Sequence, residues 1–99
     1  MAPLKRLVID VLKPHDPPLH IFAERLADLR EVDGVTASLL ETDEKVSNVK
    51  VTLKGGDVEY GVVEECIEDM GCSLHSIDEV ACGEEIVEEV RTPQDRHRC

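Results

Sequence analysis

The stretch that completes the fold is residues 73–82, SLHSIDEVAC, a strand-like segment near the end of the chain. Apolar and polar residues alternate in it as they do in a β-strand, but Leu74 and Ile77 have opposite parity. Either a β-bulge lies between them or both faces of the sheet are covered. This final strand also carries several titratable side chains, in the run His-Ser-Ile-Asp-Glu-Val of residues 75–80.

Five further segments precede this strand, and their patterns alternate between strand and helix. Strands are predicted from β-branched and alternating apolar residues at 4–12, 35–42 and 46–54. Helices are predicted from apolar residues at helical spacing over about 18–32 and 58–70. Asp16 and Asp57 precede these helices and are expected to cap them. The order βαββαβ predicts an α+β, ferredoxin-like sandwich, with a four-stranded antiparallel sheet and two helices on one face.

The parity of the strands predicts which side chains form the core. One face of the sheet is expected to carry the inner residues Leu7, Ile9, Val11, Val49, Val51 and Leu53. The other face would then present Val8, Leu12, Leu40 and Ile77. An open apolar sheet face usually binds something, so we expect the chain to form a homo-oligomer.

A second apolar run follows the last strand, where a small domain would normally end. We expect a ferredoxin-like domain over residues 1–83, a C-terminal assembly arm over 84–95 that docks on a neighbouring subunit, and a disordered tail over 96–99. The arm contains the sequence EEIVEEV, which is too short to form a stable element alone.

The charge of the chain limits its partners. Residues 57–89 contain twelve acidic residues and no Lys or Arg, within a total net charge of −11. Binding to nucleic acid or to an anionic membrane needs clustered cations, so neither partner is expected. We also expect no membrane span, no signal peptide and a cytoplasmic location. The four cysteines have no zinc-ligand spacing and are expected to be reduced.

One end of the predicted sheet gathers polar residues that could form a site. Antiparallel pairing would place His75 near Asp10 and near the proline-rich connector 13–18, KPHDPP. We therefore predict ligand-binding residues at Asp10, Lys13, His15 and His75, and metal ligands at Asp10, His75, Asp78 and Glu79. This set of carboxylates and imidazoles favours a divalent cation, Ca²⁺ or Mg²⁺ rather than Zn²⁺. Asp10 is the least ordinary of them, because an unpaired carboxylate in a central strand is costly.

Two separated motifs resemble a known family. The first motif is residues 7–15, LVIDVLKPH, and the second is residues 75–80, which are followed by Gly83, residues 86–88 and residues 92–95. The chain resembles the archaeal "domain of unknown function 211" family over about residues 4–95. The resemblance implies a small ferredoxin-like protein that assembles into oligomers. It implies no catalytic residue, because the family has no established activity.

Three functions remain open from the sequence. The first is a non-enzymatic oligomeric module that binds a small ligand or divalent cation where subunits meet. The second is a small enzyme that uses His75 and Asp10 as an acid–base pair. The third is a structural scaffold for protein partners. No nucleophilic triad and no glycine-rich phosphate loop is present in the sequence, which weighs against the enzyme.

Overall fold

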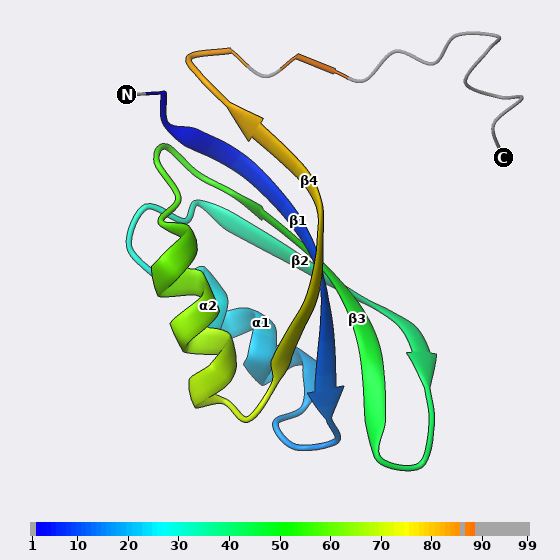
Figure 1. The fold of residues 1–99 in the computed structure, drawn as a ribbon. Coiled ribbons are helices and arrows are strands. Elements are labelled where there is room, and N and C mark those ends of the chain that lie inside the picture. The colour runs from blue at the N-terminus through cyan, green and yellow to red at the C-terminus, as the bar shows by residue number, and fades with distance from the viewer. Residues whose placement is uncertain (1, 86, 89–99) are drawn as a thin grey trace, which may run out of the picture.

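The computed structural model describes residues 2–85 and 87–88, and it has the predicted element order. The elements are β1 (Leu4–Pro14), α1 (Leu19–Ala27), β2 (Gly34–Thr42), β3 (Val46–Lys54), α2 (Tyr60–Asp69) and β4 (Ser73–Cys82). The four strands form one antiparallel sheet in the order β2-β3-β1-β4. Both helices lie on the same face of this strongly twisted sheet (Figure 1). The ferredoxin-like prediction is therefore confirmed.

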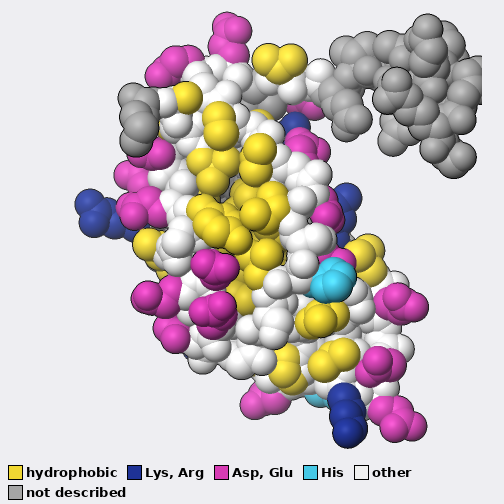
Figure 2. Space-filling view, viewed as in Figure 1, with side chains coloured by type: hydrophobic (Ala, Val, Ile, Leu, Met, Phe, Trp, Pro, Cys, Tyr) yellow, Lys and Arg dark blue, Asp and Glu magenta, His cyan; other side chains and the backbone are white. Residues whose placement is uncertain are grey.

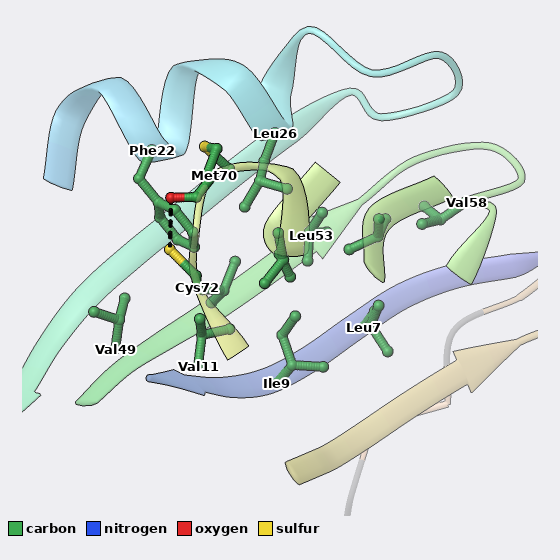
Figure 3. Packing of buried hydrophobic residues seen from close by; sticks show 13 residues of the cluster. Leu7, Ile9, Val11, Phe22, Leu26, Val49, Leu53, Val58, Met70 and Cys72 are labelled. Carbon is green, nitrogen blue, oxygen red and sulfur yellow. Dashed lines mark hydrogen bonds between the residues drawn. The ribbon is translucent and has the colours of Figure 1, made fainter. Parts of the chain in front are cut away.

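The core lies between the helices and the sheet, as the alternation predicted. The fully buried residues of β1 and β3 pack against two residues from each helix (Figure 3). These residues are Leu7, Ile9, Val11, Val49, Val51, Leu53, Phe22, Leu26, Val63 and Ile67. Aliphatic side chains fill almost all of this volume, so Phe22 is its largest single component.

Both helices are shorter than predicted, and neither uses the predicted cap. Pro18 and Glu59 occupy the N-cap positions, and no side-chain hydrogen bond caps either helix. The expectation that Asp16 and Asp57 act as caps is therefore wrong. For Asp57, the reason is that the next residue is held against the sheet: the Val58 amide donates to the Leu4 carbonyl at 2.8 Å.

A close approach of backbone fixes the loop between α1 and β2. Glu31 in this loop has a positive φ of 67°, and its carbonyl lies against Gly55, which follows β3. A Cβ atom on residue 55 would overlap that carbonyl oxygen. Gly55 is therefore required here because it has no side chain.

Most of the open face of the sheet is polar, so the prediction of an apolar open face is confirmed only for Val8 and Leu12, which lie on it as predicted. Val8 lies on this face but is only 7% exposed. Ile77 pairs with the core residue Ile9, which places it on the helix side of the sheet. Leu40 lies at an irregularity in the β2–β3 pairing. Most other positions on the open face of β1, β2 and β3 are polar: Arg6, Asp10, Thr36, Ser38, Asn48, Lys50, Thr52 and Lys54.

The exposed apolar surface lies on the helix side instead. Figure 2 shows hydrophobic side chains gathered in a strip along the middle of the viewed face, with acidic side chains around its margin. The large apolar residues of α2 and β4 that are exposed are Val62, Ile77 and Val80, at 40%, 49% and 57%. Within the described residues, no helix is long and apolar enough to cross a membrane.

The arm and the tail lie mostly outside the described residues. Of the predicted arm at 84–95, the structure describes residues 84–85 and 87–88, and the predicted tail at 96–99 is not described. The positive φ of Gly83, 106°, turns the chain out of β4, and its amide donates to the Pro3 carbonyl at 2.8 Å. The point where the arm leaves the domain is therefore fixed.

Replacing Phe22 with alanine tests how much this small core contributes to the stability of the fold. We expect Phe22→Ala to lower the free energy of unfolding by about 3–5 kcal/mol, because it removes buried area and leaves a cavity. The neighbouring Ile21 is 36% exposed, so Ile21→Ala is the matched control and should cost less than about 1 kcal/mol. Urea denaturation followed by circular dichroism measures both values. Equal losses for the two variants would contradict the assigned core.

Candidate functional site

Two bulges in β4 decide where its polar side chains lie. Asp10 pairs with Ser76 while Val11 pairs with Leu74, so His75 has no partner on β1. A second shift between Val8 and Ile9 likewise leaves Asp78 without a partner. The opposite parity of Leu74 and Ile77 therefore has its origin in bulges. Both bulged residues are exposed, as is typical where a bulge redirects a side chain.

Asp10 lies in the middle of the open face and lacks a full set of hydrogen bonds. Its Oδ1 atom is buried, and no described protein group donates to it. Its Oδ2 atom accepts one long hydrogen bond from Asn48 Nδ2, at 3.5 Å. Lys50 on β3 and Ser76 on β4 are its direct neighbours across the two strand pairs. A carboxylate in this position favours a donor or cation that would satisfy the free oxygen.

Ser76 and Asp78 form the polar edge next to Asp10. Ser76 Oγ donates to Asp78 Oδ1 at 2.9 Å, which orients the exposed Asp78 carboxylate beside the position that pairs with Asp10. Oxygen atoms from Asp10, Ser76 and Asp78 therefore belong to one region of the open face. Oxygen ligands of this kind suit Ca²⁺ and Mg²⁺.

His75 is not joined to Asp10. The imidazole is exposed, and within the described residues neither a hydrogen bond nor an ion pair links it to any carboxylate. A general base needs its partner within hydrogen-bonding reach. The acid–base pair that the enzyme hypothesis requires is therefore not formed in this structure.

Glu79 is held by Arg6, a residue to which the sequence assigned no role. Arg6 Nε and Nη2 donate to Glu79 Oε2 at 3.0 and 2.7 Å across the β1–β4 pair. This hydrogen-bonded carboxylate raises the pKa of Arg6. Glu79 already has a cationic partner, so its carboxylate would have to leave Arg6 to bind a metal ion. The register of β1 against β4 brings the two residues together, and this register could not be predicted from the sequence.

Lys13 and His15 hold the connector that follows β1. The Lys13 side chain is only 4% exposed, and its Nζ donates to the carbonyls of Pro14 and Pro17 at 2.8 and 2.7 Å. His15 Nε2 donates to the Glu44 carbonyl at 2.9 Å in the β2–β3 turn. These contacts give both residues a structural role, and the structure does not bring them to the Asp10 region.

The β2–β3 turn is organised by Asp43. Its Oδ1 atom accepts hydrogen bonds from the amides of Val46 and Lys45 at 3.0 and 2.9 Å. These hydrogen bonds lower the pKa of the Asp43 carboxyl. The turn that His15 contacts is therefore held from both sides.

The predicted metal ligands do not converge within one chain. Among the residues that the structure describes, no group of three or more His, Cys, Asp or Glu side chains is arranged to hold a metal ion. Asp10 and Asp78 remain available, whereas Glu79 is paired with Arg6. A cation bound here would therefore need further ligands from water or from a second subunit.

The thiols at the core are unsuited to nucleophilic chemistry. Cys72 is 4% exposed and Cys66 is partly buried, while Cys82 is exposed. Burial raises the pKa of the Cys66 and Cys72 thiols from the ordinary value of 9.0, and the nearby Lys13 charge only partly opposes this for Cys72. Both side chains therefore behave as small apolar residues of the core.

The fold and the open face define a class of protein: a small ferredoxin-like α+β domain with a polar sheet face and an incompletely bonded carboxylate in a central strand. Residues 5–96 match the model of the family DUF211, described as "Uncharacterized ArCR", and the chain belongs to that family. A protein of the archaeon Methanocaldococcus jannaschii, "Uncharacterized protein MJ0319", is 46% identical over 97 residues, which cover 98% of this chain and 100% of that protein. The resemblance to this family that the sequence showed is thus confirmed.

Replacing Lys13 tests its structural role. We expect Lys13→Met to lower the free energy of unfolding by about 2–4 kcal/mol, because the carbonyl oxygens of two partly buried residues lose a charged donor. The exposed Lys45 offers a matched control, and Lys45→Met should change stability by less than about 0.5 kcal/mol. Thermal and urea unfolding measure both variants. If Lys13→Met unfolds like the control, the ammonium does not hold the connector.

The buried thiols predict a dependence of stability on pH. Because Cys66 and Cys72 hold their protons more tightly in the folded state, the unfolded chain ionises first and stability should fall as pH rises above about 9. Urea unfolding at a series of pH values from about 8 to about 9.5 measures this slope. A Cys66→Ala/Cys72→Ala variant should show a flatter slope, and an unchanged slope would contradict the assignment.

Proposed function

We propose that this protein is a non-enzymatic module that self-associates and binds a divalent cation or a small cationic ligand at Asp10, where subunits meet. The observation that carries the proposal is the buried Oδ1 atom of Asp10, to which no described protein group donates. Such an atom costs free energy in the isolated chain, and a bound cation would remove that cost.

The neighbours of Asp10 favour a hard cation. Ser76 and Asp78 lie in the same region and offer oxygen atoms. Oxygen ligands select Ca²⁺ or Mg²⁺ over Zn²⁺, which prefers nitrogen and sulfur. Asp10 as a whole is partly exposed, so a ligand can reach the carboxylate and rotation about Cβ–Cγ can present either oxygen.

A junction between subunits explains why the ligand set is incomplete. One chain does not bring three ligating side chains together within its described residues. A second subunit would supply the missing oxygen atoms and shield the site from water. The net charge of −11 also favours an assembly in which cations offset repulsion between acidic chains.

A structural scaffold for protein partners is the second candidate, and one observation favours it. The exposed strip of Val62, Ile77 and Val80 on the helix side is apolar and lies away from Asp10 on the opposite face. An apolar strip of this kind is typical of a protein-binding surface. This function requires no ligand at Asp10, so the two candidates make different predictions.

Calorimetric titration tests the cation site. Chelator-treated protein is titrated with Ca²⁺, Mg²⁺, Mn²⁺ and Zn²⁺, and we expect the strongest binding from Ca²⁺ or Mg²⁺. Asp10→Asn should weaken binding by about tenfold or more, because it removes the central charged ligand. The exposed Asp33 is the matched control, and Asp33→Asn should bind as the wild type does.

The stability of the same variants separates a binding role from a structural role. In the absence of cation, Asp10→Asn should be as stable as the wild type or more stable, because it replaces a carboxylate whose buried Oδ1 atom lacks a donor with a neutral amide. Absence of heat with all four cations would contradict the cation site. A large loss of stability in Asp10→Asn would instead assign Asp10 to the structure of the sheet.

A further inference from the structure

The open face of the sheet carries a groove that mixes cationic and anionic side chains. The groove has a volume of about 340 Å³, and its lining residues are Arg6, Val8, Lys50, Thr52, Glu79 and Glu88. Arg6 lies directly opposite Lys54 on β3, so two like charges face each other across the strand pair. Like charges in that arrangement are destabilising unless an anion lies near them. Apart from Glu88, the lining of the groove holds two cations, Arg6 and Lys50, and one carboxylate, Glu79, so the groove favours a further carboxylate.

The C-terminal arm already offers such a carboxylate within one chain. Glu88 Oε1 lies 3.6 Å from Arg6 Nη1, and the Glu88 side chain is 75% exposed. By comparison, Glu79 contacts the same guanidinium at 2.7 Å and is 40% exposed. The groove thus accepts an acidic residue of the arm, although the contact in the isolated chain is long and open to solvent.

The described part of the arm leaves its apolar side chain without a place on its own domain. Val87, next to Glu88, is 84% exposed. A hollow of about 410 Å³ lies between Val87 and the end of β4, lined by residues 79–82 and Val87. An arm that belonged to its own domain would be expected to fill this hollow. In a single chain, the arm therefore places the Glu88 carboxylate near Arg6 but leaves the Val87 side chain exposed to solvent.

We propose that the groove over Arg6, Lys50 and Thr52 receives the acidic arm of a second copy of this chain, with Glu88 bound to Arg6 of the partner. The proposal rests on the proposed function, because it identifies the surface where subunits meet. The charges are complementary: Glu88 is the residue of the described arm that reaches the groove, whereas Arg6, Lys50 and Lys54 are cations of the open face.

The fixed exit of the chain makes an exchange of arms physically simple. The Gly83 amide donates to the Pro3 carbonyl, so a different direction of the chain after Gly83 would leave the hydrogen bonds of the sheet in place. The Arg6–Glu88 contact of one chain is then formed between two chains, as in domain swapping. Lys50 in the groove pairs directly with Asp10, so an arm from a partner would also bring carboxylates toward Asp10.

Charge reversal and complementation test the exchange in the full-length chain. Sedimentation of the wild type should show a dimer or larger assembly, and Glu88→Arg should weaken self-association by about tenfold or more, because attraction to Arg6 becomes repulsion. Glu84→Arg makes the same charge change on the same arm but outside the groove, and it should self-associate as the wild type does. A wild-type monomer, or equal effects of both substitutions, would overturn the proposal.

Mixing two variants distinguishes contacts between chains from contacts within one. Arg6→Glu/Glu79→Gln reverses the charge in the groove, and the second change avoids two facing carboxylates. Each variant alone should be largely monomeric, whereas an equimolar mixture with Glu88→Arg should recover wild-type mass. The reason is that the acidic groove of one variant and the basic arm of the other can meet only between chains. A mixture that stays monomeric would overturn the exchange of arms.

Two controls keep the outcome clear. If the groove variant does not fold by circular dichroism, Glu88→Arg against Glu84→Arg decides the question, because both sites are exposed on the arm. If Ile77→Asp dissociates the wild-type assembly and Glu88→Arg does not, the chains meet through the helix-side strip and the proposal is overturned. Calorimetry on Asp10→Asn reports separately on the cation, so failure of the arm exchange and failure of the cation site remain distinguishable.

Discussion

The hydrogen bonding of β1 along both of its edges is the interaction on which the rest of the structure depends. β3 fixes one edge in unbroken register from Arg6 to Pro14, and β4 fixes the other with irregularities. Because β1 is central, its odd-numbered residues Leu7, Ile9 and Val11 are fully buried beneath the helices. Its even-numbered residues then have to lie on the open face, and this places Arg6 and Asp10 there.

The difference between the two edges of β1 accounts for the character of the open face. On the β3 side, regular pairing sets Lys54 opposite Arg6 and Lys50 opposite Asp10. On the β4 side, bulges leave His75 and Asp78 without partners on β1, while Glu79 keeps its place beside Arg6. Bulges interrupt the ladder of an edge strand and limit its pairing with another sheet. We therefore infer that association through an arm suits this chain better than association through the β4 edge.

The charge distribution and the unsatisfied groups point to the same face. In a chain of net charge −11, three cationic side chains gather on the open face of β1 and β3, next to a carboxylate with a buried free oxygen. The proposed acidic arm would pair with the cationic side chains, and the proposed cation would bind the Asp10 carboxylate. If the proposals hold, each would lower an electrostatic cost that a single chain leaves in place.

The sequence by itself determined the elements, their order and the core, because apolar periodicity is a local property that survives in the linear chain. It predicted β3 and β4 with their observed bounds, the inner residues Val49, Val51 and Leu53, and an irregularity near Ile77. It also singled out Asp10 as unusual. It placed Ile77 on the wrong face, because a bulge changes the side of every residue that follows it.

Only the tertiary structure decided which polar residues meet. The pair of Arg6 with Glu79 joins strands from the two ends of the chain, and it depends on a register that two bulges set. The isolation of His75, the anchoring of Lys13 by Pro14 and Pro17, and the free oxygen of Asp10 likewise follow from three-dimensional placement. The physical reason is that side-chain partners across a sheet are set by strand register, whereas the periodicity of a segment reports only which of its faces is buried.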